Sequence, residues 1–347
     1  MNDDWSGLGK PPSFAVVGLG GAGSETVADL IELGLGRVRP FCINTDARHL
    51  VALRVDERIL IGHRQLRGRG SGGDRARVLQ AAEESREELL RRLAEAEVAV
   101  LVAGLGGGTG SALLPWLVRA LRSREVLTVP VVFLPFHIEL DTNPVRQENV
   151  ARALEELEAL GGLLVVLANE KLRRFRGVPI HRVFRVRSSY VHSLVMSLHD
   201  MIESPSDLNV DLASLKGHLA DAGLSTVLFG ECHVAEPDRL VAQAWTETLL
   251  DFDLTNDASA LVHLDAGENL TLDAVDTVLR TLSQKLRSPK RLVFGTRIRP
   301  ERREVVRLTA VLGGVKPRRS AREFAPAGEP FPLSVRPVGV GRSSSPR

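Results

Sequence analysis

The chain has 347 residues, 44% of them apolar and 25% charged, so it is long enough for two globular domains with separate cores. Its formal net charge of +2 gives no basis for predicting a nucleic-acid partner. Cys42 and Cys232 show no CxxC spacing, so neither a disulfide nor a metal site is predicted. The first residues lack the pattern of a signal peptide and no apolar run reaches 18 residues, so we expect a cytoplasmic protein.

Short apolar segments alternate with helical patterns through the first half of the chain. Continuous apolar strands separated by helices are typical of a parallel sheet that is covered on both faces. We therefore predict a Rossmann-like α/β domain over residues 13–178. The strand candidates are SFAVVGLG (13–20), PFCINTD (40–46), VAVLVAG (98–104), LTVPVVFLPF (127–136) and GGLLVVLAN (161–169), with helices near 24–34, 74–97, 110–123 and 145–160.

The second half of the chain is organised differently. A long helical pattern predicts a central helix within 179–205, and mixed strand and helix patterns predict a smaller α+β domain over 206–313. Residues 314–347 are rich in Arg, Pro, Ser and Gly, and we expect them to be disordered. From Lys316 onwards seven basic residues face two acidic ones, so this tail is either a contact for acidic lipid or an acidic partner, or a solvated linker.

The first strand candidate ends in a glycine-rich turn. Gly18, Gly20 and Gly23 fit the GxGxxG pattern, and Asp46 closes the second strand candidate. This combination is close to the dinucleotide-binding fingerprint, in which glycines admit a pyrophosphate and an acid binds a ribose. The alternative is a tight strand-to-helix turn that needs glycine for its backbone angles.

Two further glycine-rich segments favour a nucleotide with more phosphates. GLGGGTGS (104–111) follows a later strand of the same predicted sheet, and RGRGSGGD (67–74) precedes a long helix. If all three loops lie where the strands end, three helix N-termini converge on one anion. One pyrophosphate does not need so many N–H donors, whereas a nucleoside triphosphate does.

The GGGTGS motif at 106–111 resembles the signature motif of the tubulin/FtsZ superfamily, and within it the chain is most similar to FtsZ. The resemblance covers about residues 14–313 and extends to further motifs in the same order. They are the first phosphate loop (GLGGAG, 18–23), the second loop (INTDA, 43–47), the third loop (LRGRGSGGD, 66–74), the sugar-binding segment (PFHIE, 135–139), the base-contacting loop (LANEKL, 167–172), the synergy loop (DLNVDLASLK, 207–216) and the last core strand (VVRLTAVLGG, 305–314).

The resemblance implies binding of GTP or GDP, and it admits Mg²⁺ beside the phosphates. It implies that Glu139 contacts the ribose, Asn169 reads the guanine and Phe184 stacks on it, with Glu25 near the base. The other implied nucleotide contacts are Gly20, Gly21, Ala22, Gly23, Asn44, Asp46, Gly70, Ser71, Gly72, Gly106, Gly107, Gly108, Thr109, Gly110, Ser111 and Pro135.

The resemblance also implies self-assembly. Asn209 and Asp211 of the synergy loop would complete the nucleotide site of the next subunit, so hydrolysis would depend on head-to-tail polymerisation. The family's two synergy-loop acids are here Asp211 and Ser214, which predicts slow hydrolysis. A cell-division, cytoskeletal or membrane-remodelling role follows by the same resemblance.

The sequence departs from the family at several nucleotide contacts. A carboxylate accepts well from the N1–H and N2–H₂ groups of guanine, so Glu25 can replace a lost contact, and Arg67 or Arg69 can supply a lost cation. The departures are Glu25 for an asparagine, Ser188 and Ser189 for an asparagine–aspartate pair that faces the guanine, and Asn143 for an arginine.

Three alternatives to an active GTPase are open at this point. Ser214 favours a nucleotide-gated scaffold with little turnover. The departures allow a relative that binds nucleotide poorly or not at all. The GxGxxG pattern with Asp46 allows a Rossmann-type dehydrogenase that uses NAD.

Overall fold

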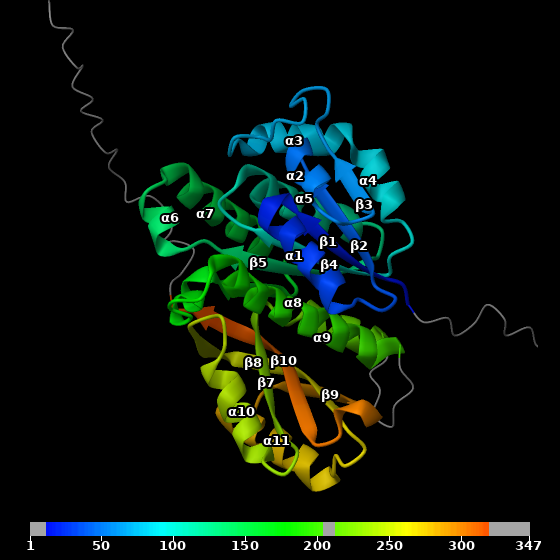
Figure 1. Ribbon diagram of the computed structural model, residues 1–347, viewed down its shortest axis with the longest axis vertical. Helices are drawn as coiled ribbons and strands as arrows, with labels where there is room; N and C mark the ends of the chain where they lie inside the picture. The colour runs from blue at the N-terminus through cyan, green and yellow to red at the C-terminus, as the bar shows by residue number, and fades with distance from the viewer. Residues whose placement is uncertain (1–11, 204–211, 319–347) are drawn as a thin grey trace, which may run out of the picture.

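The computed structural model describes residues 12–203 and 212–318 (Figure 1). The strands of these residues form one ten-stranded sheet in the order β3-β2-β1-β4-β5-β6-β7-β10-β8-β9. The first six strands pair in parallel, and the apolar sequences of β1, β2, β4, β5 and β6 predict this. They are β1 (Phe14–Leu19), β2 (Arg39–Asn44), β3 (Glu57–Leu60), β4 (Val98–Gly104), β5 (Leu127–Leu134) and β6 (Leu164–Ala168).

Helices cover both faces of this parallel part. Alternate residues of β1 divide between two cores: Val17 packs in the core under α3, α4, α5 and α7, and Val16 packs in the core under α1 and α8. The helices are α1 (Gly20–Leu33), α2 (Ala47–Ala52), α3 (Arg75–Glu84), α4 (Arg86–Arg92), α5 (Gly108–Arg122), α6 (His137–Asp141) and α7 (Pro144–Ala159), with a 3₁₀ helix, η1 (Asn169–Arg174).

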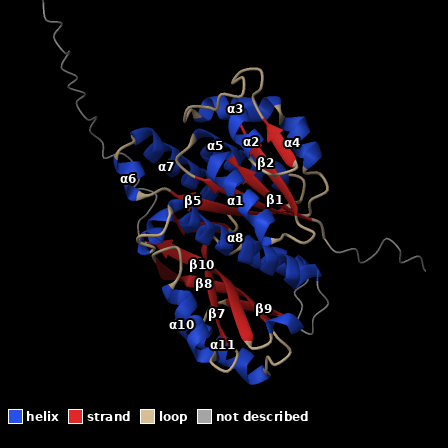
Figure 2. Ribbon diagram, in the orientation of Figure 1, coloured by secondary structure: helices blue, strands red, loops and turns tan. Residues whose placement is uncertain are grey.

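The C-terminal part continues the same sheet with a different pairing. β10 pairs antiparallel with both β7 and β8, and α10 and α11 lie on one side of these strands (Figure 2). The elements are α9 (Leu212–Ala220), β7 (Leu224–His233), α10 (Pro237–Thr246), β8 (Phe252–Ala266), α11 (Leu272–Lys285), β9 (Arg291–Ile298), η2 (Pro300–Arg302) and β10 (Val305–Pro317).

The long helix α8 (Ile180–Glu203) lies between the two parts of the molecule (Figure 1). Its buried residues Val191, Leu194 and Leu198 join the core that it shares with α1. Near its C-terminal end, Asp200 pairs with Arg299, which follows β9, at 2.6 Å. The helix therefore contacts both the parallel part and the C-terminal part of the sheet.

The predicted fold class is confirmed: a mostly parallel α/β sheet, a long central helix and a smaller α+β part. The boundaries differ in places. The predicted helix over 74–97 is two helices, α3 and α4, which meet at Ser85, and β3 was not predicted. β10 extends to Pro317, into the predicted tail, and residues 319–347 of that tail lie outside the described part. Over the described ranges, no helix is both long and apolar enough to cross a membrane.

Candidate nucleotide-binding site

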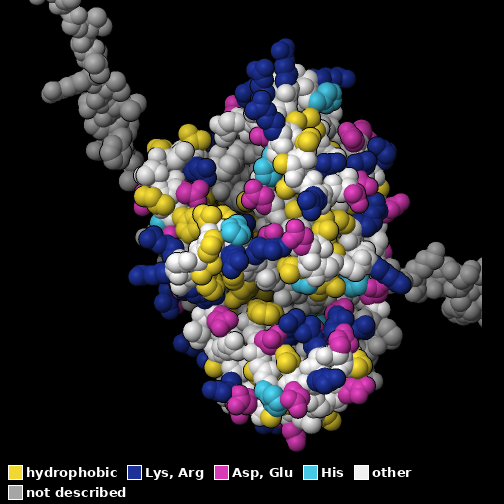
Figure 3. All heavy atoms as spheres, viewed as in Figure 1, with side chains coloured by type: hydrophobic (Ala, Val, Ile, Leu, Met, Phe, Trp, Pro, Cys, Tyr) yellow, Lys and Arg dark blue, Asp and Glu magenta, His cyan; other side chains and the backbone are white. Residues whose placement is uncertain are grey.

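A cavity of about 290 Å³ lies at the edge of the sheet where the parallel strands end. Its walls come from segments at the ends of β1, β4, β5 and β6, which are neighbours in the sheet, and from α1, α5 and α8. The surface is hollowed between α6–α7 and α1–α3 (Figure 3). The lining residues are Gly20, Gly21, Ala22, Glu25, Gly104, Leu105, Gly107, Gly108, Thr109, Gly110, Phe133, Pro135, Glu139, Arg146, Asn169, Phe184 and Arg187.

Two helices present uncapped N-termini to this cavity. Neither α1 nor α5 has a side-chain cap or an acidic residue in its first turn. By contrast, α3 and α7 are capped by the side chains of Asp74 and Asn143. The first N–H groups of a helix have no intrahelical acceptor and carry the positive end of the helix dipole. The ends of α1 and α5 therefore suit an anion such as phosphate.

The glycines after β4 are required for different reasons. A Cβ on Gly108 would lie 2.3 Å from Ser71 Oγ, and one on Gly110 would lie 2.4 Å from the Gly104 carbonyl oxygen, so protein packing requires both. A Cβ on Gly107 would meet no protein atom within 4 Å, and its φ of −77° suits any residue. Nothing within the protein requires glycine at 107, so its absent side chain leaves room for something that the cavity binds.

Hydrogen bonds of side chains hold this loop in shape. Ser111 Oγ accepts the Gly106 N–H at 2.9 Å, and the hydroxyls of Thr45 and Thr109 are 2.8 Å apart. Asn149 of α7 donates to the carbonyl oxygens of Gly73 and Gly106. The loop after β4 is therefore fixed before any ligand binds, which lowers the entropic cost of binding.

Glu25 of α1 is held by a histidine. Its Oε1 lies 3.1 Å from His49 Nε2, and this hydrogen bond lowers the pKa of Glu25 and raises the pKa of His49. His49 is positioned by Asp46, which caps α2 by accepting the N–H groups of Arg48 and His49, and by Asn44, whose Nδ2 is 3.4 Å from His49 Nδ1. Asn44 and Asp46 thus position His49, which in turn holds the lining residue Glu25.

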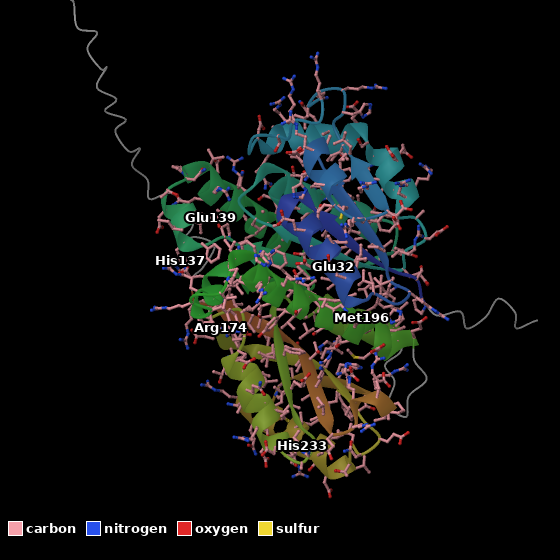
Figure 4. The ribbon with its side chains drawn as sticks, viewed as in Figure 1. Glu32, His137, Glu139, Arg174, Met196 and His233 are labelled. Carbon is pink, nitrogen blue, oxygen red and sulfur yellow. The ribbon has the colours of Figure 1, made fainter. Side chains whose placement is uncertain are left out.

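The cavity has a cationic side chain, Arg146, that was not predicted from the sequence. Arg146 of α7 lines the cavity and pairs with Glu139 of α6 at 2.8 Å; Figure 4 labels Glu139, near His137 of the same helix. Asn143, at the position of the family's arginine, caps α7 instead. Arg67 and Arg69 are exposed on the loop before α3 and are not among the lining residues, whereas Arg146 is.

Aromatic and amide groups line the part of the cavity next to α8. Asn169 follows β6, and the rings of Phe184 and Phe136 are 6.3 Å apart. The guanidinium of Arg187 lies 4.0 Å from the ring centre of Phe133 and 4.8 Å from that of Phe184. Burial lowers the pKa of Arg187 to about 10, so it is charged at neutral pH. This part suits a flat, polar ring system.

The structure gathers most of the predicted nucleotide contacts around one cavity. Those that line it are Gly20, Gly21, Ala22, Glu25, Gly107, Gly108, Thr109, Gly110, Pro135, Glu139, Asn169 and Phe184. The rest are outside the lining, where several brace it: Gly23, Asn44, Asp46, Gly70, Ser71, Gly72, Gly106 and Ser111. The third glycine loop thus lies beside the cavity, and its helix α3 is capped by Asp74, so two helix N-termini converge rather than three.

The predicted base-facing serines are elsewhere. Ser188 is fully buried and donates to Asp29 at 2.6 Å, and Ser189 is half-buried and donates to the Arg185 carbonyl oxygen. Arg187 lines the cavity in their place. No sequence signal identified Arg187, because the resemblance to the family points to positions 188 and 189 and not to the residue before them. The predicted catalytic residues, Asn209 and Asp211, lie outside the described residues, and Ser214 is exposed in the first turn of α9.

Comparison with known proteins identifies the family. The model described as the tubulin/FtsZ family, GTPase domain, matches residues 13–177, and that of the FtsZ family, C-terminal domain, matches residues 223–316. Cell division protein FtsZ 1 of Methanocaldococcus jannaschii is 33% identical over 307 residues, covering 88% of this chain and 84% of that protein. The chain belongs to the tubulin/FtsZ family. The FtsZ of Methanothermobacter thermautotrophicus is 29% identical over 303 residues, covering 87% of this chain and 79% of that protein.

Solved structures of the tubulin/FtsZ family have the same fold. A point mutant of M. jannaschii FtsZ superposes with a TM-score of 0.78 at 33% identity, covering 88% of this chain and 92% of that one. CetZ2 from Haloferax volcanii superposes with a TM-score of 0.75 at 23% identity, covering 90% and 96%. Membership in this family assigns the glycine turn after β1 to an FtsZ-like GTPase domain and argues against the dehydrogenase alternative.

Proposed function

We propose that the chain binds GTP and GDP in the cavity and assembles head to tail into filaments. The observation that carries the proposal is that two uncapped helix N-termini line one cavity, in which a Cβ on Gly107 would meet no protein atom. Phosphate oxygens are the acceptors that such N–H groups bind. The match to the GTPase-domain model supports a guanine nucleotide.

The other walls fit the rest of a nucleotide. Glu139 has carboxylate oxygens that accept from ribose hydroxyls, and Phe184 offers a ring on which a base can stack. We propose that Mg²⁺ is held mainly by the phosphates and water, as is common for this ion.

The fold supports completion of the site by a second subunit. Arg187 of α8 lines the cavity, and the segment that carries Asn209 and Asp211 begins after Glu203, where α8 ends. Sixteen residues of helix separate these two points by about 24 Å. The synergy segment therefore starts far from the cavity of its own subunit, at the opposite edge of the sheet. We therefore propose that this segment completes the cavity of another copy rather than that of its own subunit.

Contacts between two different faces of identical subunits build open filaments. M. jannaschii FtsZ, 32% identical to this chain, has been solved as a dimer, which supports self-association. We propose that Asp211 orients or deprotonates the attacking water, with Asn209 beside it. A serine hydroxyl at 214 can only hydrogen-bond, and loss of one general base typically costs about 10²–10⁴ in rate. Polymers should therefore turn over slowly.

A mixing experiment tests completion in trans. Gly107→Val removes nucleotide binding and keeps the synergy loop, whereas Asp211→Ala keeps nucleotide binding and removes the carboxylate. Each variant alone should release little phosphate from GTP. The mixture should regain activity, because Asp211 of the first variant acts on GTP bound by the second. Failure of the mixture to exceed the sum of its parts, while the two variants co-pellet, contradicts catalysis between subunits.

Ser214→Asp tests the second candidate function, a nucleotide-gated scaffold with little hydrolysis, which Ser214 favours. The substitution should raise phosphate release without changing GTP affinity. Wild-type protein that hydrolyses GTP as fast as Ser214→Asp excludes the scaffold. GTP-dependent polymers that release no phosphate in wild type but do so in Ser214→Asp establish it.

A further inference from the structure

Arg187 is a buried charge whose hydrogen-bond partners among the described residues are neutral. Its residue is 3% exposed, and among the described residues no Asp or Glu forms an ion pair with it. The two carboxylates that line the cavity are each paired elsewhere: Glu25 with His49, and Glu139 with Arg146. Burial of a charge costs free energy unless polar groups compensate it, so the site leaves Arg187 needing acceptors.

The hydrogen bonds of Arg187 within the protein are incomplete. Nη1 donates to Asn169 Oδ1 at 3.1 Å, and Nη2 donates to Thr26 Oγ1 at 3.4 Å. Nε is buried and has no acceptor among the described residues. A guanidinium has five N–H groups in a fixed fork, and a buried donor without an acceptor is unfavourable. Nη1 and Nη2 each carry a second N–H, and because Arg187 lines the cavity, a ligand there can supply acceptors for these two groups.

We propose that Arg187 determines base selectivity by donating hydrogen bonds to O6 and N7 of guanine. This inference rests on the proposed binding of guanine nucleotide and names how the base is read. A guanidinium only donates, and the O6/N7 edge of guanine only accepts, which is the common pairing of arginine with guanine. Adenine has an amino group at the position of O6, so its donor would face the donors of Arg187.

Glu25 offers the competing way to read the base. Its carboxylate would accept from N1–H and the 2-amino group of guanine, at a different edge of the ring. However, its Oε1 is already engaged by His49, and its side chain is 56% exposed. Arg187 is the more buried and less satisfied of the two, so its contact contributes more to discrimination.

Two purine analogues separate the two edges. Inosine triphosphate keeps O6 and N7 but lacks the 2-amino group; 2-aminoadenosine triphosphate keeps the 2-amino group but has an amine in place of O6. In competition against a fluorescent GTP analogue, inosine triphosphate should bind within about threefold of GTP. ATP and 2-aminoadenosine triphosphate should both bind about 10- to 100-fold more weakly, as loss of a hydrogen bond to a charged group predicts.

Arg187→Met keeps an apolar side chain between the two rings and removes every N–H. The affinities of this variant for GTP and ATP should converge to within about threefold, and the ratio of the two is informative even if both fall. Arg182→Met, an exposed arginine on the same helix, is the matched control and should keep wild-type discrimination. Thermal unfolding of both variants verifies that they are folded.

Three results overturn the proposal. Weak binding of inosine triphosphate with strong binding of 2-aminoadenosine triphosphate would place recognition at the 2-amino group, on Glu25. Tighter binding of every nucleotide by Arg187→Met would show that Arg187 fills the base position rather than reading the base. Absence of any nucleotide binding by wild-type protein would remove the proposed function itself, and this inference with it.

Discussion

Gly107→Val tests whether the cavity binds phosphate, and the structure makes it a clean perturbation. A Cβ at this position meets no protein atom within 4 Å, and the backbone angles are ordinary, so we expect the folded protein to accept the new side chain. The melting temperature should stay within about 3 °C of wild type. The added methyl groups would instead occupy the space in front of the N–H groups at the start of α5.

The expected loss of affinity can be worked from those donors. If the side chain keeps phosphate from two N–H groups, and each hydrogen bond to a charged group contributes about 1.5–3 kcal/mol, binding weakens by roughly 3–6 kcal/mol, or about 10²–10⁴ in Kd. Titration of a fluorescent GTP analogue measures this. Gly217→Val, in α9, is the control, because its Cβ also meets nothing within 4 Å but lies far from the cavity. Equal affinity of Gly107→Val and wild type would refute phosphate binding at this loop.

Three further outcomes are expected. The pKa of the His49 imidazole, followed by NMR, should lie above its ordinary value and return toward that value in Glu25→Gln. Because the folded pKa is raised, the stabilisation that His49 contributes through this pair is complete below about pH 6.5 and is lost as the pH rises through the folded pKa. An unshifted His49 pKa in wild type would contradict this prediction. Asp265→Ala should lower the unfolding free energy by roughly 2–4 kcal/mol in denaturant titration, because Arg302 loses the carboxylate that it pairs with and Arg299 keeps only Asp200; a loss below about 1 kcal/mol would show that water replaces the carboxylate. Deletion of residues 319–347, which spares β10, should leave GTP affinity unchanged and abolish flotation with acidic liposomes at low salt; unchanged flotation would exclude an electrostatic membrane contact of the tail.

The sequence predicts this fold well because local patterns and tertiary structure agree. Uninterrupted apolar strands such as 98–104 can only be buried on both faces, and this requirement dictates the parallel sheet. It also predicts most of the cavity, since glycines after a strand mark where backbone must approach a ligand. The sequence does not show which side chains of a helix face the cavity or which distant segments pack against each other.

Ser188 and Arg187 illustrate that limit. They are adjacent in sequence, and a rotation of about 100° along α8 decides which one lines the cavity. Asp29 of α1 accepts the Ser188 hydroxyl, and this contact between two helices is not encoded in any motif. Arg146 was missed for a similar reason: Asn143 at the family position caps α7, and the cation comes from the next turn.

GTP-dependent sedimentation, with phosphate measured in the same tube, tests the central claim most directly. Wild-type protein should pellet with GTP and remain in the supernatant without nucleotide, and phosphate should accumulate slowly and only where polymer forms. Gly107→Val should do neither. Pelleting that is equal with and without GTP, or phosphate release by dilute protein that does not sediment, would contradict a nucleotide-dependent filament whose subunits complete one another's sites.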